Sequence, residues 1–439
     1  MDGVVSLTQC AIPQFGSFTY RFKIGEDEAG TFWYHAHSDV HRADGLFGAL
    51  VVHKPVNSEG SAEMQEYHYD AEQLLLVGDW FHRPAESVLE SYLDYRHFKI
   101  EPAPDSILVN GRGAFNCSRA VPSNPVECTD TERPAVSLPE GRTRLRIMNT
   151  GSITGFSLAF GGFQIRVIQV DGGGLVSEAP SSKAVGVLYP GERMDLIIER
   201  APEENVQDPM LTIQLDMRDL AFPNLALVST QQFPVEAVGQ ISEGVSQKPN
   251  DTLVLYTNIE YLTRYGNIPK GFVNRTSWTL SPSVAPLVAL GRFQRPSDVF
   301  IPAIAVSEPG KEKDVIVVLN NMDDKSHPFH LHGHSFDVLA SHEGKPGSYD
   351  AYNPFSDEEP AGGPLNLRNP VKKDTVVVPR SGYVVLRFSP DNEGLWLFHC
   401  HVLWHQAVGM AMAFEVGRGS DQPLSENARA LCAEGKGST

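Results

Sequence analysis

Short runs in which apolar and polar residues alternate recur along most of the chain, and turn residues separate them. The clearest runs are 74–81, 143–151, 163–172, 185–199, 211–217, 252–258, 314–321 and 375–388. Because successive side chains of a β-strand point to opposite faces of a sheet, this alternation predicts strands rather than helices. Glycine, proline and aspartate between the runs are typical of turns. The sequence therefore predicts an all-β protein built from β-sandwiches.

The order of these runs predicts three consecutive sandwiches. We expect an incomplete first domain at 1–58, a second domain at 59–232 and a third at 233–439. A length of 439 residues suits two or three domains, and a hydrophobic content of 41% is ample for their cores. The middle domain carries no metal-binding pattern, so its scattered histidines are expected to be structural.

Charge excludes two classes of partner. The chain carries 36 basic and 54 acidic residues, a formal net charge of −18. This balance disfavours binding to nucleic acids and to anionic membranes, both of which reward clustered Lys and Arg. There is no apolar run of 18 residues, and the first ten residues lack the basic start and apolar core of a signal peptide. We expect no nucleic-acid or membrane partner, and a monomer.

The densest chemistry lies between Leu397 and Phe414, in the run LFHCHVLWHQAVGMAMAF. If this run begins as a strand, His399 and His401 face one side of the sheet and Cys400 faces the other. Two metal centres are therefore implied, one on each side. Cysteine, histidine and a weak methionine are the soft ligands of a blue copper site, so His405 and Met410 are candidates to join Cys400.

Two further histidine clusters lie far upstream. His35 and His37 form one His-x-His pair, and four histidines at 327, 330, 332 and 334 form the other cluster. His327 is the natural partner for Cys400 and His405. Of the 15 histidines, ten lie in or beside the three clusters if His41 is counted. A single pair would normally be a surface or core feature, but three pairs with one embedded cysteine favour several metal ions.

Three segments resemble three of the four copper motifs of the multicopper oxidases, the family of laccases, ascorbate oxidases and ferroxidases. They are GTFWYHAHSDVHRADGLFG, HPFHLHGHSF and HCHVLWHQAVGM, and the runs DGVVSLTQCAI, LVNGRGAFNCS and VIQVDG also resemble family landmarks. The resemblance implies a type 1 copper held by His327, Cys400 and His405 with Met410 axial. It further implies a type 2 ligand at His330 and type 3 ligands at His35, His37, His332, His399 and His401.

The same resemblance implies cupredoxin-like Greek-key sandwiches and a reaction. A complete enzyme would hold four coppers, one of type 1, one of type 2 and two of type 3. A small reducing substrate would give electrons at the blue site, and Cys400 would pass them through the adjoining His399 and His401 to the cluster that reduces O2 to water. Asp2 matches an acidic residue that helps deliver protons in the family. Leu403 lies where some members carry a second acid, which puts that branch of the proton route in doubt.

The first copper motif of the family, His-x-His-Gly, is absent from this sequence, in which no histidine precedes His35. An internal comparison points the same way. The run from Gly16 to His37 parallels the run from Gly382 to His401, and in the later copy a histidine pair precedes by 69 residues. Its counterpart in the first copy would lie before residue 1. We therefore expect the chain to be truncated at its N-terminus.

Five cysteines leave four once Cys400 is set aside as a metal ligand. The spacing of Cys117 and Cys128 suits a local bridge, and a Cys10–Cys432 bridge would tie the two ends together, as in the resembled family; four buried thiols are the alternative. Sequons begin at Asn116, Asn250 and Asn274. We expect a secreted glycoprotein.

The substrate is the least determined feature. Met410, in place of Leu or Phe, resembles the ascorbate oxidase branch and many fungal relatives, and implies a low to middling potential. Gly161 lies where phenol-oxidising and iron-oxidising members tend to carry an acid, although a neighbouring loop could supply one. Small phenols or enediols are the expected substrates. An iron oxidase, a relative that keeps only a blue copper site, and a zinc-binding sandwich are the alternatives.

The remaining histidines are not expected to bind a metal ion. His41 occupies a position where many family members have Gln, and we expect it to support a ligand or simply to pack. We expect structural roles for the other histidines outside the ligand set, which are His53, His68, His82, His97, His334 and His342.

Overall fold

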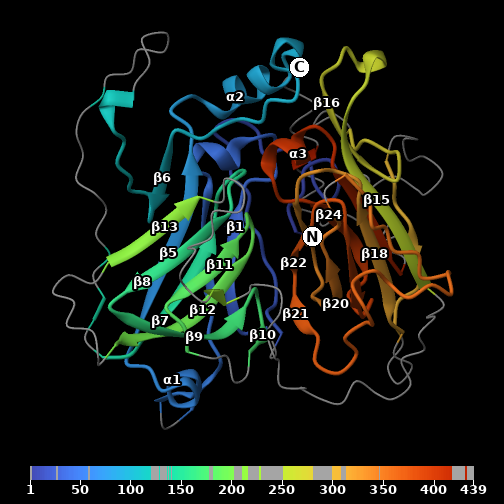
Figure 1. Ribbon diagram of the computed structural model, residues 1–439. Helices are drawn as coiled ribbons and strands as arrows, with labels where there is room; N and C mark the ends of the chain where they lie inside the picture. Colours follow the sequence, from blue (N-terminus) through green and yellow to red (C-terminus); the bar gives the residue numbers. More distant parts are fainter. Residues whose placement is uncertain are drawn as a thin grey trace.

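The computed structural model describes residues 2–25, 28–57, 60–119, 128, 136, 138–139, 141–176, 181–201, 210–215, 227–228, 251–279, 299–307, 313–345, 347–417 and 431–432. Figure 1 shows two β-sandwiches side by side, the second in blue to green and the third in yellow to red, with the red helix α3 at their boundary. The strands far outnumber the helices. The predicted all-β class is therefore confirmed.

The second sandwich packs a six-stranded sheet on a four-stranded sheet. The larger sheet has the order β10 (Gly174–Leu175), β9 (Phe163–Val170), β12 (Arg193–Arg200), β7 (Thr143–Asn149), β5 (Ala71–Trp80) and β6 (Ser106–Val109). The smaller has the order β13 (Met210–Leu215), β8 (Phe156–Gly161), β11 (Ala184–Leu188) and β14 (Leu227–Val228). β5 and β7 pair in parallel, which distinguishes this sheet from a simple meander.

The third sandwich packs six strands on five. The first sheet has the order β16 (Pro269–Val273), β15 (Asp251–Tyr261), β18 (Val315–Asn321), β23 (Tyr383–Phe388), β20 (Phe336–His342) and β21 (Val371–Lys373). The second has the order β17 (Ala303–Ile304), β25 (Ala411–Val416), β24 (Gly394–Cys400), β19 (His327–Leu331) and β22 (Thr375–Val378). β24 and β19 pair with His399 opposite His330, so two of the three histidine clusters share one sheet.

The N-terminal part contributes two small antiparallel pairs, β1 (Gly30–His35) with β2 (Phe47–Val52) and β3 (Val56–Asn57) with β4 (Gly60–Ser61). Large apolar side chains are exposed on residues 12–50, namely Ile12, Phe15, Tyr20, Phe22, Ile24, Tyr34, Leu46 and Leu50. Phe15 is 99% exposed.

Helices are short. They are α1 (Ala62–Tyr67), α2 (Ala85–Tyr92) and α3 (Leu403–Ala407), with 3-10 turns η1 (His41–Asp44), η2 (Tyr95–His97), η3 (Cys117–Arg119) and η4 (Thr263–Tyr265). α2 buries Ala85, Val88 and Tyr92 on one face, and the Asp44 carboxylate accepts a hydrogen bond from the Ala85 N–H at 2.9 Å. Within the described part, none of the helices has the length and apolar character needed to span a membrane.

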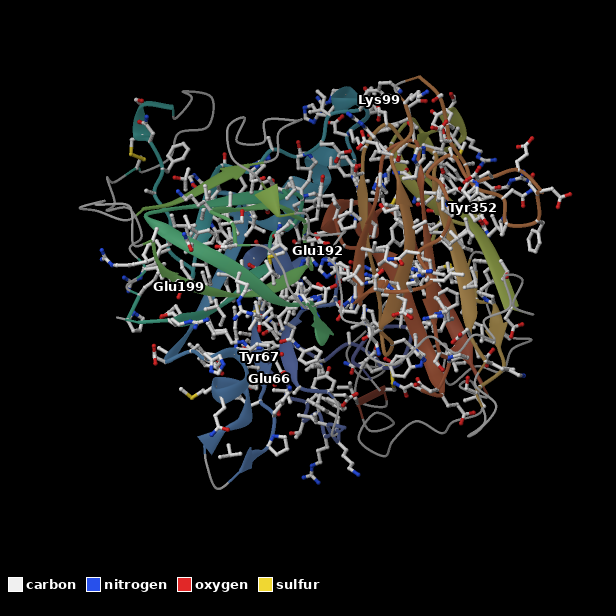
Figure 2. All side chains as sticks on the ribbon, turned by 60° about the horizontal axis from the view of Figure 1, so that its bottom comes forward. Glu66, Tyr67, Lys99, Glu192, Glu199 and Tyr352 are labelled. Carbon is white, nitrogen blue, oxygen red and sulfur yellow. A yellow bond between two sulfur atoms is a disulfide. The ribbon has the colours of Figure 1, made fainter. Side chains whose placement is uncertain are left out.

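Buried ion pairs join the second and third sandwiches. Arg193 of β12 contacts Asp374 at 2.5 Å, and Lys373 of β21 lies 3.4 Å from Asp171 and 3.1 Å from Glu192. Figure 2 shows Glu192 between the two sandwiches. Burial raises the pKa of Glu192 to about 6, against the opposing effect of Lys373. This part of the junction is therefore charged, whereas elsewhere the boundary is apolar, with the rings of Phe81 and Trp404 5.3 Å apart.

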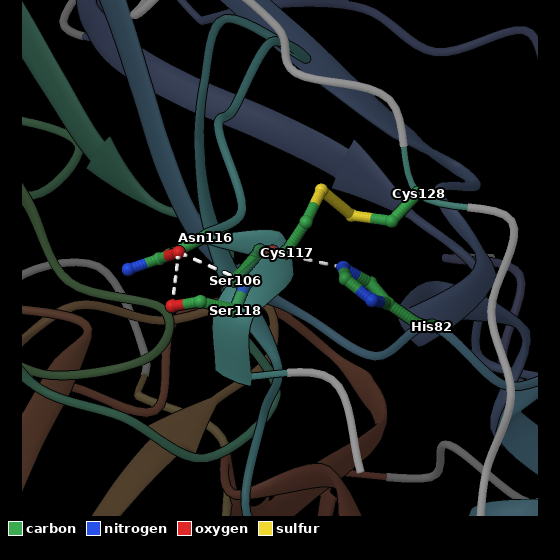
Figure 3. The surroundings of a disulfide bond; sticks show 6 residues. All are labelled: His82, Ser106, Asn116, Cys117, Ser118 and Cys128. Atoms are coloured by element: carbon green, nitrogen blue, oxygen red, sulfur yellow. Dashed lines mark hydrogen bonds between the residues drawn. A yellow bond between two sulfur atoms is a disulfide. The ribbon is translucent and has the colours of Figure 1, made fainter. Parts of the chain in front are cut away.

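Both predicted disulfides are confirmed. Cys10 bonds Cys432, and Cys117 bonds Cys128, while Cys400 is free and buried. Figure 3 shows the second bridge beside Asn116, whose side-chain oxygen accepts hydrogen bonds from the N–H and hydroxyl of Ser118.

Candidate metal centres

Cys400, His327 and His405 form a closed triangle inside the third sandwich. Cys400 Sγ lies 3.8 Å from His327 Nδ1 and 3.7 Å from His405 Nδ1, and the two nitrogens are 3.1 Å apart. A point in this triangle lies about 2.1 Å from all three atoms, which fits bonds from a metal ion to nitrogen and sulfur of about 2.0–2.3 Å. All three residues are almost completely buried. The structure thus brings together Cys400, His405 and His327, the three residues expected to share one metal ion.

A tight reversal of the chain returns Met410 to this triangle. α3 carries His405 and ends before Gly409, whose φ of +108° lets the chain turn back into β25. The N–H of Met410 then donates to the His405 carbonyl at 3.0 Å, and the N–H of Cys400 donates to the Met410 carbonyl at 3.0 Å. Met410 is fully buried. Its main chain therefore lies beside Cys400 and His405, and the axial role of its sulfur stays a prediction.

Charges around Cys400 favour the thiolate. Burial alone would raise the pKa of the thiol, but hydrogen bonds with His327 and His405 lower it to about 7. Burial would lower the pKa of His405, while Glu101 and Cys400 raise it to about 10. The thiolate is the form of cysteine that binds metals, so this donor set suits a soft metal ion such as copper.

Two carboxylates contact the outer nitrogens of the same histidines. Asp323 Oδ2 lies 2.9 Å from His327 Nε2, and Glu101 Oε2 lies 3.3 Å from His405 Nε2. The Glu101 carboxylate also accepts a hydrogen bond from Lys325 at 2.8 Å. Both carboxylates remain partly exposed, whereas the imidazoles behind them are buried. Neither acid was predicted, because Glu101 is 304 residues from His405 and Asp323, four residues before His327, belongs to none of the motifs.

The other six candidate histidines gather on the opposite side of β24. Ligand nitrogens of His37, His332 and His399 lie within 4.8 Å of one another, and His332 Nε2 is 3.2 Å from His399 Nε2. The rings of the three neighbours join this group: His35 lies 4.7 Å from His37, His401 lies 5.5 Å from His399, and His330 lies 5.0 Å from His332 between ring centroids. Adjacent residues of one strand therefore serve two separate groups, as alternation predicts.

Hydrogen bonds on Nδ1 orient several of these rings. The Nδ1 atoms of His35 and His399 lie 3.1 and 3.0 Å from main-chain carbonyls, and that of His332 lies 2.7 Å from Asp2 Oδ2. When Nδ1–H donates, Nε2 keeps its lone pair for a metal ion. Burial raises the pKa of Asp2, but its hydrogen bond with His332 brings the pKa below the ordinary value. Asp2 is therefore anionic and fixes the His332 ring.

Low pKa values keep four imidazoles of the cluster neutral. Burial is the main cause of the strongly lowered pKa of His35, His37, His399 and His401. Neutral imidazole is the form that binds a metal ion. The cluster therefore suits copper in its chemistry as well as in its geometry.

Arg42 is a neighbour of the cluster that the motif pattern did not single out. It is 1% exposed, its Nη2 donates to the His401 carbonyl at 2.8 Å, and its Nη1 lies 2.7 Å from His401 Nδ1. Its charge is the second cause of the lowered pKa of His35 and His401. The preceding residue, His41, is exposed, and its supporting role stays a prediction.

Other histidines have structural surroundings, as expected. His334 is buried between the rings of Phe388 and Trp396, with centroids at 5.2 and 5.8 Å. His82 lies 2.8 Å from the hydroxyl of Ser106, and His342 lies 3.1 Å from Asp350.

One further group of possible ligands, His53, Glu63 and Glu72, lies outside these two centres. Its carboxylates are already paired: Glu63 contacts Arg144 at 2.8 Å, and Glu72 contacts Arg146 at 3.0 Å. Both arginines are buried. An ion-pair network accounts for this group.

Comparisons with known proteins agree with this geometry. Three family models, each described as multicopper oxidase, match residues 1–57, 71–213 and 283–420. L-ascorbate oxidase from Cucumis sativus is 30% identical, with 95% of this chain and 77% of that protein covered. The iron transport multicopper oxidase fetC from Epichloe festucae is 27% identical, with 94% and 65% covered.

Among solved structures, the laccase from Botrytis aclada superposes with a TM-score of 0.71 at 24% identity. The superposition covers 100% of this chain and 79% of that one. It supports the arrangement of the sandwiches described above.

Proposed function

The chain belongs to the multicopper oxidase family, and we propose that it oxidises small phenols or enediols one electron at a time while O2 is reduced to water. Bound copper supplies the one-electron chemistry of such an oxidase. The observation that carries the proposal is the covalent link between the two centres. Cys400 belongs to the buried triangle, and its neighbours His399 and His401 belong to the imidazole cluster on the other face. An electron can therefore cross between them through a few bonds of one strand.

The outer edge of the triangle supports an organic reductant. His327 and His405 are buried, so a donor reaches them through the partly exposed carboxylates of Asp323 and Glu101. A phenol or enediol gives up its electron most readily when its hydroxyl donates a hydrogen bond, and a carboxylate beside the imidazole can accept that bond. Lys325, 43% exposed and 2.8 Å from Glu101, adds a positive charge that attracts an anionic enediol.

Oxidation of ferrous ions is the second candidate. Hard cations prefer oxygen ligands, and two carboxylates lie beside the triangle. One of the relatives is named as an iron transport oxidase. Against this, the Lys325 ammonium pairs with Glu101, and the Asp323 carboxylate also accepts the Ile259 N–H at 2.8 Å, so both acids are partly committed.

Copper content and oxygen uptake test the proposal. The copper-loaded protein should consume O2 with 2,6-dimethoxyphenol and with ascorbate, and Lys325→Gln should raise KM for the anionic ascorbate several-fold while leaving the neutral phenol unchanged. Glu101→Gln should slow both organic substrates. Asp337→Asn, a change at an ion pair with Arg387 elsewhere in the third sandwich, is the control.

Three results would redirect the assignment. Faster oxidation of ferrous ions than of both organic substrates, lost in Glu101→Gln and Asp323→Asn, would establish the iron oxidase. A protein that binds about one copper, turns blue and consumes no O2 would be the non-catalytic relative. A colourless metal-bound protein would be the zinc alternative.

We propose further that the chain is a secreted, monomeric glycoprotein with domains at 1–58, 59–232 and 233–439. Two disulfides support an oxidising compartment. The Asn116 sequon is exposed next to one of them (Figure 3), which leaves the side chain open to modification. Mass spectrometry of the secreted protein before and after glycosidase treatment tests this proposal, and an unmodified Asn116 would contradict it.

A further inference from the structure

Arg193, at the start of β12, contacts one segment that supplies histidines to the cluster, β1, and two residues that lie beside the other histidines, Asp374 and Gly191. Its Nε donates to the Thr31 carbonyl in β1 at 3.1 Å, and one terminal nitrogen donates to the Gly191 carbonyl at 3.0 Å. Its two terminal nitrogens hold both carboxylate oxygens of Asp374 at 2.6 and 2.5 Å. Arg193 is 3% exposed, so these bonds are made away from water. A two-pronged bond of this kind fixes orientation as well as distance.

The Asp374 end of this contact sets the ring of His330. The Asp374 carbonyl accepts hydrogen bonds from His330 Nδ1 at 2.9 Å and from the Leu331 N–H at 3.0 Å. The Thr375 hydroxyl, 3.1 Å from the same Nδ1, donates to the Asp374 carboxylate at 2.9 Å. With Nδ1–H committed to these oxygens, His330 presents Nε2 to the cluster. The Arg193 fork therefore holds the side chain of the residue whose carbonyl accepts from the His330 ring.

The other two contacts reach the remaining side of the cluster. Thr31 lies four residues before His35 on the same strand. The bond from Arg193 to the Thr31 carbonyl therefore helps to fix the position of β1, and with it His35, relative to the cluster. Gly191 lies against the His401 ring, where a Cβ would come within 2.6 Å of a ring carbon. Arg193 thus bonds Thr31, Gly191 and Asp374, each of which lies beside a different histidine of the cluster.

We propose that Arg193 is a positioning residue for the imidazole cluster, which aligns the segments of His35, His330 and His401 through its planar fork. The proposal rests on the proposed function, because it assumes that this cluster binds copper. It differs from a purely structural ion pair in one respect: the cluster, and not the Cys400 triangle, depends on it.

Substitution of Arg193 separates these two possibilities. Arg193→Lys keeps the charge without the fork, and Arg193→Met keeps neither. Loss of a residue that orients metal ligands typically weakens metal affinity by about 10–100-fold. We expect about tenfold weaker copper binding at the cluster in Arg193→Lys and about a hundredfold in Arg193→Met, with an altered type 2 electron paramagnetic resonance spectrum and unchanged blue absorption from the Cys400 site.

Arg144 provides the matched control. It is also fully buried, and it contacts Asp195 at 2.6 Å, Glu63 at 2.8 Å and Gln169 at 2.8 Å in the neighbouring part of the same sandwich. Arg144→Met should lower stability as much as Arg193→Met without changing the ratio of cluster copper to blue copper. Equal ratios in the two variants would overturn the proposal.

A measurement on the copper-free protein distinguishes failure of the proposed oxidase function from failure of the positioning role of Arg193. In the copper-free protein, nitrogen NMR of labelled histidine should show His330 as the Nδ1–H tautomer, identified by its loss in His330→Gln, and as a mixture in Arg193→Met. If the wild-type cluster binds no copper but the tautomer changes as expected, the proposed function fails and the positioning role stands. An unchanged tautomer in Arg193→Met would refute the positioning role itself.

Discussion

Gly191→Ala should damage the imidazole cluster through a single added methyl group. Gly191 has a φ of +90°, and a Cβ built on it would lie 2.6 Å from Cδ2 of His401. The backbone conformation costs a non-glycine residue about 1–2 kcal/mol. The methyl group must also gain several tenths of an ångström of separation from the ring, and overpacking of this kind costs about 1–3 kcal/mol.

The expected loss of stability is therefore about 2–5 kcal/mol, the sum of the two effects. Part of the strain will be relieved by displacement of the His401 ring, because a side chain moves more readily than the turn that holds Gly191. Urea unfolding of the copper-free protein measures the first effect. Copper content relative to blue absorption measures the second, and it should fall in Gly191→Ala.

Gly111→Ala is the control for this experiment. Gly111 also has a positive φ, +75°, but a Cβ there meets nothing within 4 Å. It should lose only the conformational part, about 1–2 kcal/mol, and keep its copper ratio. If both variants lost the same stability and the same copper, the contact between Gly191 and His401 would not exist in solution.

Three further predictions concern separate parts of the molecule. Cys400→Ser should abolish the blue absorption and one bound copper, measured by optical spectroscopy and metal analysis, while a thiol assay still finds both disulfides. Replacing Cys10 and Cys432 by Ala should lower the free energy of unfolding by about 2–5 kcal/mol in urea, because the bridge closes a very long loop; an unchanged midpoint would contradict this. Asp2→Ala should weaken cluster copper by about 10–100-fold in a chelator competition, since it frees the His332 ring, whereas Asp2→Asn keeps an acceptor and should lose less.

Strand periodicity was sufficient to predict the class of fold. The run 143–151 forms β7, 314–321 covers β18, and 375–388 forms β22 and β23. What periodicity missed was α2, although its buried residues Ala85, Val88 and Tyr92 are spaced by three and four as in a helix. The signal was present, but eight residues between strong strand runs are too few to stand out.

The parts of the candidate site that depend on neighbouring residues of one strand could be predicted, and the parts that depend on distant segments could not. The opposite facing of Cys400 and its two neighbours follows from strand geometry alone, and so does the separation of two centres. Glu101 contacts His405 across 304 residues, and Arg42 contacts His401 across 359. Neither contact could be predicted from a local pattern, because a single sequence does not show which distant segments lie together in the fold.

Buried charge is the clearest case of this limit. In β7, Arg144 and Arg146 alternate with Leu145 and Ile147, which by pattern alone describes a strand with one face in water. The structure buries all four, because the arginines meet carboxylates such as Asp195, 2.6 and 2.8 Å away. Alternation determines which side chains share a face, but the neighbouring elements determine what covers that face. The residues that hold the imidazole cluster in place, Arg193 among them, belong to this class, so they emerge only when the sandwiches are seen packed together.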